Sequence, residues 1–139
     1  MLKPCLEAVA KQANIDKALV EDIVIGNVLA PGSAATNARM AMFMAGYPET
    51  TCVSTINRYC SSGLQAVASV ANSIRSGQIS IGIGGGFESM STGDLGTIFD
   101  KSQFSKEALD LEDNRLCCMP MGITVSENVA AEFGVNRAT

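Results

Sequence analysis

A cysteine between a predicted strand and a predicted helix is the residue of this chain best suited to covalent chemistry. Cys60 follows Asn57-Arg58-Tyr59 and precedes Ser61-Ser62-Gly63. A helix N-terminus presents unpaired backbone N–H groups and the positive end of the helix dipole, and both favour a thiolate over a thiol. The same N–H groups can bind an oxyanion. The position predicts a nucleophile, with a buried and inert cysteine at a strand end as the alternative.

The segments on either side of Cys60 supply the two elements that position it. Residues 51–56 are rich in β-branched side chains, which indicates a short buried strand. After Cys60, apolar residues recur at the spacing of an amphipathic helix, and Gly77 ends the repeat. The repeating residues are Leu64, Val67, Ala68, Ala71 and Ile74. We therefore expect Cys60 to lie on the first turn of a helix.

Helical and extended patterns alternate along residues 1–84. Residues 2–13 have one apolar helical face that ends at 14–17, and residues 23–29 read as a strand buried on both faces. Residues 36–45 are apolar nearly all round, which predicts a helix buried within the protein, and residues 79–84 form a third strand. This alternation predicts the α/β class, with a parallel sheet and helices on both of its faces.

The glycine run 82–86 resembles a nucleotide-binding loop only superficially. The third glycine of that fingerprint would fall at Phe87, so the fingerprint fails. We interpret the run as a glycine segment packed closely beneath an active site, with a plain turn at the end of a strand as the alternative.

Composition restricts the function further. The chain has 139 residues, 47% of them hydrophobic and 17% charged, with a net charge of -4 and no apolar run long enough to span a bilayer. This is typical of one domain of a soluble enzyme. The ten Lys and Arg residues are spread along the sequence, which argues against a nucleic-acid or anionic-membrane partner. Five cysteines without C-x-x-C spacing argue against a disulfide framework or a metal site and favour a reducing compartment.

Four sequence blocks resemble those of the thiolase family, in particular the N-terminal half of 3-ketoacyl-CoA thiolases (acetyl-CoA C-acyltransferases) of the peroxisomal type. Their order and spacing agree with the family across nearly the whole chain. The blocks are Glu21-Asp22-Ile23-Val24-Ile25-Gly26-Asn27-Val28-Leu29, Asn57-Arg58-Tyr59-Cys60-Ser61-Ser62-Gly63-Leu64-Gln65-Ala66, Gly85-Gly86-Phe87-Glu88-Ser89-Met90-Ser91 and Met119-Pro120-Met121-Gly122-Ile123-Thr124.

The resemblance implies a thiolase-like half-domain, that is, a mainly parallel sheet flanked by helices plus an inserted loop domain. Residues 1–90 match the partial α/β domain, residues 91–122 the loop-domain insertion and residues 123–139 a return helix. Residues 91–120 look irregular. The family's chain is nearly three times as long, so this chain looks truncated and looks to lack a strand central to the sheet. We therefore expect unpaired backbone groups and a chain that is marginally stable or aggregation prone.

The resemblance also implies a chemistry for Cys60. That residue would accept an acyl group from 3-ketoacyl-CoA with release of acetyl-CoA, and coenzyme A would then remove the shortened acyl chain. Coenzyme A is a substrate here, and no metal or other cofactor is implied. By resemblance, Met90, Met121 and Gly122 lie near the substrate. A homodimer, a peroxisomal location and a role in fatty-acid β-oxidation are usual for this subtype.

Two features leave other functions open. The sequence has no histidine, whereas the family takes histidines and an acid-base cysteine from its C-terminal half, and Tyr59 stands where this subtype usually has glutamine. A non-catalytic fragment that at most pairs with a thiolase subunit through the strand before Cys60 is therefore the alternative. A ketoacyl synthase shares the fold and the cysteine, but the Gly-Gly-x-Glu-Ser-Met block favours a thiolase.

Overall fold

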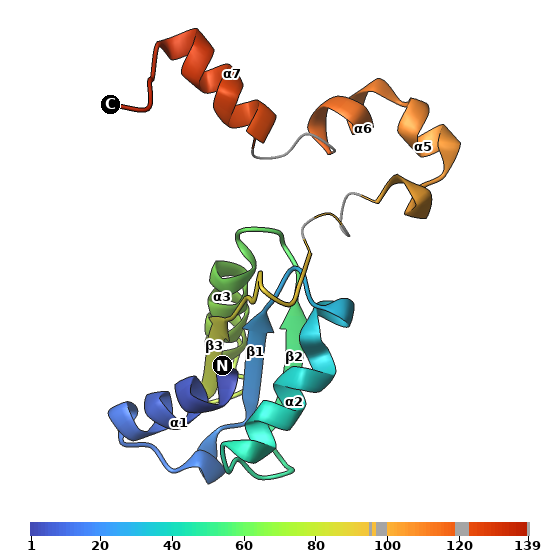
Figure 1. Ribbon diagram of the computed structural model, residues 1–139. Coiled ribbons are helices and arrows are strands. Elements are labelled where there is room, and N and C mark those ends of the chain that lie inside the picture. Colours follow the sequence, from blue (N-terminus) through green and yellow to red (C-terminus); the bar gives the residue numbers. More distant parts are fainter. Residues whose placement is uncertain (95, 97–99, 119–122, 139) are drawn as a thin grey trace. The chain divides into compact units, whose positions relative to one another are not determined.

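The computed structural model describes residues 1–94, 96, 100–118 and 123–138. The chain divides into two compact units, Met1–Asp94 and Leu95–Thr139 (Figure 1). The first unit contains the described strands and the Cys60 turn, so it is the unit that positions the candidate site.

The first unit is built on a parallel sheet of three strands. These are β1 (Asp22–Gly26), β2 (Cys52–Ile56) and β3 (Gly82–Gly86), in the order β2-β1-β3. Ile25 of the central strand pairs with Thr55 on one side and Gly85 on the other. The arrowheads of the strands point to the same edge of the sheet (Figure 1). The α/β class predicted from the sequence is therefore confirmed.

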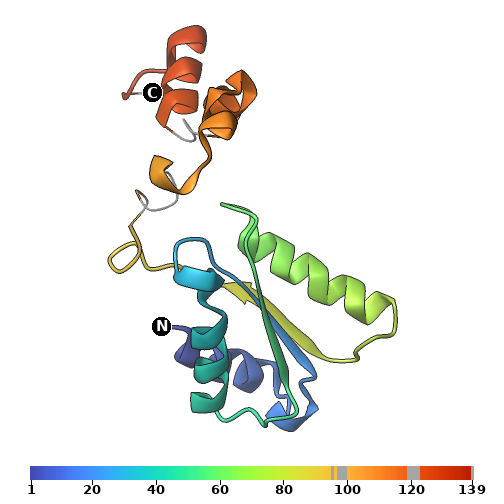
Figure 2. The same ribbon diagram turned by 90° about the vertical axis from the view of Figure 1, so that its right-hand side faces the viewer.

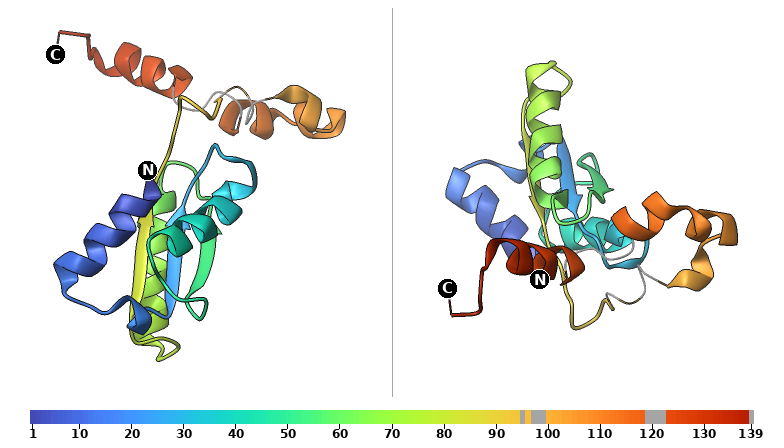
Figure 3. Two further views of the ribbon diagram at one scale, coloured as in Figure 1. Left: turned by 60° about the horizontal axis from the view of Figure 1, so that its bottom comes forward. Right: turned by 90° about the horizontal axis from the view of Figure 1, so that it is seen from above.

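Helices cover both faces of this sheet. The step from β1 to β2 runs through α2 (Ala35–Met44), and the step back to β3 runs through α3 (Ser62–Arg75). Because the two steps cross the sheet in opposite directions, right-handed connections place the two helices on opposite faces. Figures 2 and 3 show α3 alone on one face, with α2 and α1 (Leu2–Ala13) on the other.

Each face has its own apolar core, because side chains alternate along β1. Ile23 and Ile25 point toward α1 and α2, where they pack in a cluster with Leu6 and Met42. Val24 points to the other face and packs with Ala66 and Val70 of α3. The central strand is thus buried on both sides, as its continuous apolar sequence predicts.

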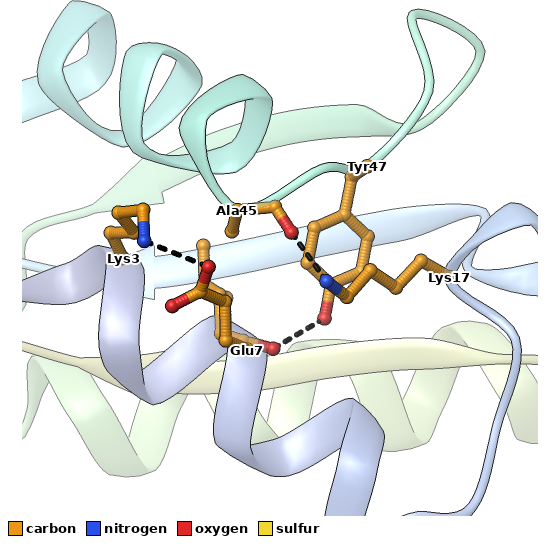
Figure 4. A network of polar contacts seen from close by, with 6 residues as sticks. Lys3, Glu7, Lys17, Ala45 and Tyr47 are labelled. Carbon is orange, nitrogen blue, oxygen red and sulfur yellow. Dashed lines mark hydrogen bonds and ion pairs between the residues drawn. The ribbon is translucent and has the colours of Figure 1, made fainter.

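Polar contacts fix α1 against the chain that follows α2 (Figure 4). The buried Tyr47 hydroxyl donates to the Leu6 carbonyl oxygen at 2.7 Å, and burial raises the pKa of that phenol. The Lys17 ammonium donates to the Ala45 carbonyl oxygen at 2.5 Å and lies over the Tyr47 ring. A surface ion pair joins Lys3 and Glu7 at 2.8 Å within α1, and the hydrogen bond from Lys3 lowers the pKa of Glu7.

Glycines allow α3 to lie unusually close to the sheet. A Cβ atom on Gly26 would lie 2.4 Å from the carbonyl carbon of Ser62, and one on Gly84 would lie 2.7 Å from the Cα of Val67. One on Gly86 would lie 3.3 Å from the Cα of Gly63. Distances below 3.0 Å are not tolerated, so the helix can rest on the strands only where side chains are absent. The glycine run is therefore strand β3 in close contact with a helix, and not a simple turn.

Two predicted strand boundaries are wrong. The third strand was expected at residues 79–84 but begins at Gly82, because the N–H groups of Ser80 and Ile81 donate to the Glu21 carboxylate. The first was expected at residues 23–29 but ends at Gly26, because the N–H groups of Val28 and Leu29 donate to the Glu88 carboxylate. In both cases a glutamate replaces the neighbouring strand as the acceptor.

The helix faces also differ from the predicted ones. In α2 only Ala38 and Met42 are buried, whereas Met40, Phe43 and Met44 are exposed, so the expected burial of this helix on all sides is wrong. In α3 the buried residues are Ser62, Ala66 and Val70. The apolar repeat that defined the helix lies on its outer side instead. Leu64 is 74% exposed, Val67 49% and Ile74 42%.

The expected gap in the middle of the sheet is absent from the described chain. β1 and β3 pair directly over five residues, from Asp22 opposite Gly82 to Gly26 opposite Gly86. The backbone reason for expecting a marginally stable chain is therefore wrong, and the prediction of aggregation itself stays untested.

The second unit contains short helices. The described elements are the 3-10 turn η3 (Lys101–Gln103), α5 (Lys106–Asp110), α6 (Glu112–Cys117) and α7 (Ile123–Phe133). The Ser105 hydroxyl accepts the Ala108 N–H at 3.1 Å and caps α5, and the Asn114 amide donates to the Ala108 carbonyl oxygen at 2.8 Å and ties α6 to it. The irregular structure expected for residues 91–120 is thus wrong over Lys106–Cys117.

Candidate functional site

The carboxyl ends of the three strands bring three loop segments to one edge of the sheet. β1 is followed by Asn27–Leu29, β2 by Asn57–Ser61 and β3 by Phe87–Ser89. Ligands of open α/β sheets commonly bind beyond the carboxyl ends of the strands. The segments belong to three of the four sequence blocks singled out above.

Cys60 lies at this edge, exposed and with a free thiol. It precedes the N-cap residue Ser61, whose carbonyl oxygen accepts the Gln65 N–H at 2.9 Å as the first helical bond. The thiol is therefore one residue before the cap and not on the first turn, a small correction to the prediction. The exposure of Cys60 argues against the alternative of a buried, inert cysteine at a strand end.

Hydrogen bonds define the turn that carries Cys60. Tyr59 has a φ of 49°, in the left-handed region that a residue with a bulky side chain rarely adopts. The Asn57 side-chain oxygen accepts the Tyr59 N–H at 3.0 Å. The buried Ser62 hydroxyl donates to the Tyr59 carbonyl oxygen at 2.6 Å and accepts the Arg58 N–H at 2.8 Å. Asn57 and Ser62 thus stabilise a conformation that Tyr59 would not adopt on its own.

The start of α3 offers donors for an anion. In the part of the chain that the structure describes, the N–H groups of Gly63 and Leu64 have no hydrogen-bond partner, whereas those of Ser61 and Ser62 are taken by the carbonyl oxygens of Arg58 and Tyr59. Unpaired N–H groups of this kind are the donors an oxyanion requires. The turn therefore combines an accessible sulfur with free backbone donors three and four residues later.

Glu88 connects the loop segments. One carboxylate oxygen accepts the N–H groups of Val28 at 2.9 Å and Leu29 at 3.1 Å. The other accepts the Asn27 amide at 3.2 Å and the Ser89 N–H at 3.3 Å. The buried Asn27 side chain in turn donates to the Phe87 carbonyl oxygen at 2.7 Å and accepts the Ala30 N–H at 3.0 Å.

Sequence reasoning missed the roles of Asn57, Ser62 and Glu88. A signal was present for Asn57, because an asparagine after a strand commonly accepts the N–H two residues on. The Glu88 contacts join residues about 60 positions apart, which local patterns do not reveal.

A cavity of about 220 Å³ lies beside these segments. Its lining residues are Asn27, Ala30, Pro31, Asn37, Phe87, Glu88, Ser89, Thr92 and Gly93. Neither Cys60 nor Met90 lines it, although Met90 is exposed nearby in the sequence. Met121 and Gly122, the other predicted substrate residues, lie outside the described residues. This cavity is therefore lined by residues other than the predicted nucleophile and Met90.

Two features are absent from the described residues. None of their helices is both long and apolar enough to cross a membrane. They also contain no group of three His, Cys, Asp or Glu side chains arranged to hold a metal ion.

Comparison with known proteins decides the family. The family model "Thiolase, N-terminal domain" matches residues 1–139, the whole sequence. The chain belongs to the thiolase family. The peroxisomal 3-ketoacyl CoA thiolase 1 of Petunia hybrida is 51% identical over 138 residues, which are 99% of this chain and 29% of the relative. The chain thus spans under a third of the length of that relative.

Solved thiolases share the fold. The dimeric peroxisomal thiolase of Saccharomyces cerevisiae is 37% identical with a TM-score of 0.82, and the match covers 98% of this chain and 35% of that one. A second structure of a peroxisomal 3-ketoacyl-CoA thiolase of Saccharomyces cerevisiae is described as five layered and constructed from two core domains of identical topology. It is 33% identical with a TM-score of 0.69, over 94% of this chain and 37% of that one. The thiolase-like α/β fold inferred from the sequence blocks is confirmed.

Proposed function

We propose that this chain carries the nucleophile of a 3-ketoacyl-CoA thiolase acting in fatty-acid β-oxidation. The Cys60 thiolate attacks the keto carbon of a 3-ketoacyl-CoA, and the bond between the second and third acyl carbons breaks. The departing carbanion takes a proton and leaves as acetyl-CoA, while the shortened acyl group stays on the sulfur. The thiolate of coenzyme A then attacks this thioester, releases a shortened acyl-CoA and restores Cys60.

The observation that carries this proposal is the environment of the thiol. In the described chain, an exposed cysteine precedes a helix whose Gly63 and Leu64 N–H groups are unpaired, and the chain belongs to the thiolase family. Each acyl transfer passes through an oxyanion that needs such donors. The glycine contacts of Gly26 and Gly86 with the Ser62–Gly63 backbone give these donors a rigid support.

The proton transfers need a general base and acid beside the thiol, and this sequence contains no histidine, the residue that most often serves as one. We assign them to a second core domain of the kind named for the Saccharomyces cerevisiae enzyme. The exposed apolar residues Leu64, Val67 and Ile74 of α3 form the surface for that domain. Contact with that domain accounts for the apolar repeat on the exposed side of α3.

Several finer expectations belong to this proposal. Coenzyme A serves as a substrate and no metal takes part, and Met90, Met121 and Gly122 contact the acyl-CoA. Met90 is accessible for such a contact, with 64% of its surface exposed. We expect a peroxisomal location and a homodimer, because the Petunia hybrida relative is peroxisomal and the Saccharomyces cerevisiae thiolase is dimeric. Residues 91–122 act as the loop domain, residues 1–90 as the partial core and residues 123–139 as the return helix.

A second candidate function is that of a non-catalytic partner. β2 lies at an edge of the described sheet, with its unpaired side open and with Cys52 and Ser54 exposed. An open edge strand can pair with a strand of another subunit. This chain would then associate with a thiolase through β2 without turning over substrate.

An assay with acetoacetyl-CoA separates the two functions. The purified chain and its Cys60→Ser variant are each mixed with acetoacetyl-CoA and coenzyme A, with and without imidazole as an external base. The enzyme proposal predicts Cys60-dependent turnover that imidazole raises. Equal rates for the two proteins under both conditions would sink it in favour of the non-catalytic partner.

A further inference from the structure

The Glu88 carboxylate occupies an unusual place for an acidic side chain. It is partly buried and accepts four hydrogen bonds, from Asn27, Val28, Leu29 and Ser89. Three of these donors are backbone N–H groups, so among the described residues loops, and not a lysine or arginine, bind this carboxylate. Such a carboxylate determines the positions of the segments that surround it.

The contacts continue from Glu88 to the Cys60 turn across the whole edge of the sheet. Glu88, which follows β3, holds the N–H of Val28, which follows β1. The Val28 carbonyl oxygen accepts the Asn57 amide at 3.3 Å, and the Asn57 oxygen accepts the Tyr59 N–H at 3.0 Å. Asn57 follows β2, and Tyr59 is bonded directly to Cys60. One chain of hydrogen bonds thus joins the Gly-Gly-x-Glu-Ser-Met block to the candidate nucleophile.

We propose that Glu88 is a positioning residue for Cys60. It fixes Val28, Val28 orients Asn57, and Asn57 keeps Tyr59 in the left-handed conformation that leads the chain through Cys60 into the start of α3. This inference rests on the proposed function, because it assigns Glu88 a role only if Cys60 is the nucleophile. Glu88 itself does not touch the reacting atoms.

The hydrogen-bond geometry requires a carboxylate at position 88. The Asn27 amide is oriented by two other bonds, to the Phe87 carbonyl oxygen and from the Ala30 N–H. Its nitrogen must therefore face Glu88. A glutamine there has a single acceptor oxygen, which can serve Val28 and Leu29, but its NH₂ group would then face the donors of Asn27 and Ser89. Two donors facing each other repel, so Glu88→Gln changes the network with almost no change in volume.

The chain offers a matched control at the opposite edge of the sheet. The Glu21 carboxylate accepts the N–H groups of Ser80 at 2.6 Å and Ile81 at 3.2 Å, before the strands begin. Glu21→Gln therefore makes the same change of side chain far from the Cys60 turn, and its one oxygen can still accept both N–H groups. A second variant, Asn57→Ser, retains an oxygen able to accept the Tyr59 N–H, but its side chain is too short to reach the Val28 carbonyl oxygen.

The test measures the alkylation of Cys60 by iodoacetamide relative to that of Cys5, an exposed cysteine on α1 of the same molecule. Mass spectrometry gives both rates between pH 6 and 9 for the wild type and the three variants. We expect the ratio of the Cys60 rate to the Cys5 rate at pH 7 to fall about tenfold in Glu88→Gln and Asn57→Ser, and the pH profile of Cys60 to change while that of Cys5 does not. Glu21→Gln leaves the ratio unchanged.

The outcomes separate this inference from the proposed function. A wild-type Cys60 that reacts no faster than Cys5 overturns the proposed function. If wild-type Cys60 reacts faster than Cys5 and Glu88→Gln keeps the same ratio of rates, the positioning role is overturned and the assignment of Cys60 as nucleophile stands. If Glu88→Gln loses its helical circular dichroism, Asn57→Ser decides, because it leaves every Glu88 contact in place. A retained ratio in that variant contradicts the proposal.

Discussion

Substitution of Gly26 by alanine tests how closely α3 lies on the sheet. The new Cβ would lie 2.4 Å from the Ser62 carbonyl carbon, 2.5 Å from the Gly63 nitrogen and 2.6 Å from the Ser62 oxygen. Ordinary contact begins at 3.4 Å, so the start of α3 must move by about 1 Å. All three atoms belong to the backbone, and no side chain can rotate to relieve the clash.

We expect Gly26→Ala to destabilise the chain by about 3 kcal/mol, at the upper end of the cost of overpacking. The assay is urea unfolding followed by circular dichroism at 222 nm. Gly85→Ala is the matched control on the neighbouring strand, because a Cβ there meets no atom within 4 Å. The displaced turn should also slow iodoacetamide at Cys60 in Gly26→Ala only. Equal urea midpoints for the two variants would refute the close packing that supports the site.

Two further predictions concern stability. First, Leu64→Ser, on the exposed side of α3, should change the unfolding free energy by less than about 0.5 kcal/mol. Val70→Ala, on the buried side, should lower it by about 1–3 kcal/mol. Urea unfolding measures both, and a larger effect of Leu64→Ser would show that the helix faces are misassigned. Second, burial raises the pKa of the Asp22 carboxyl above its ordinary 3.8. The folded chain then holds this proton more tightly than the unfolded chain, so the Asp22 contribution to stability falls as pH rises through the window above 3.8. The urea midpoint of Asp22→Asn should therefore rise relative to that of the wild type as pH increases from 3 to 7. A fall of this midpoint relative to the wild type would contradict the raised pKa.

Local patterns in the sequence were sufficient for the elements around the site. The β-branched run before Asn57 predicted β2 within one residue, and the helical repeat after Cys60 predicted α3. Both signals depend on neighbouring residues only. The junction that carries Cys60 could for that reason be located before any contact was known.

The same repeat could not show which side of α3 is buried. Its apolar residues, such as Leu64, face outward, while Ser62, Ala66 and Val70 face the sheet. The small residues are inside because the glycines of β1 and β3 bring the backbones together, and that closeness depends on strand pairing. A hydrophobicity pattern reflects every surface that a helix buries, including surfaces buried by other domains. We propose that the exposed apolar side of α3 contacts the second domain.

The Glu88 network was also beyond sequence reasoning. Glu88 belongs to a block that was recognised by resemblance, yet its partners lie on loops that follow other strands. Only the sheet order β2-β1-β3 places those loops side by side. The ends of β1 and β3 depend on such long-range acceptors, which explains why both boundaries were mispredicted.

Transfer of an acyl group to Cys60 is the most direct test of the account. The chain is incubated with acetoacetyl-CoA, quenched in acid and digested, and each cysteine peptide is examined for an added acetyl group by mass spectrometry. We predict the acetyl group on Cys60, sensitive to hydroxylamine, and its loss when coenzyme A is added before the quench. An acetyl group spread evenly over Cys5, Cys52 and Cys60, or found on the others and not on Cys60, would contradict the proposed role of this thiol.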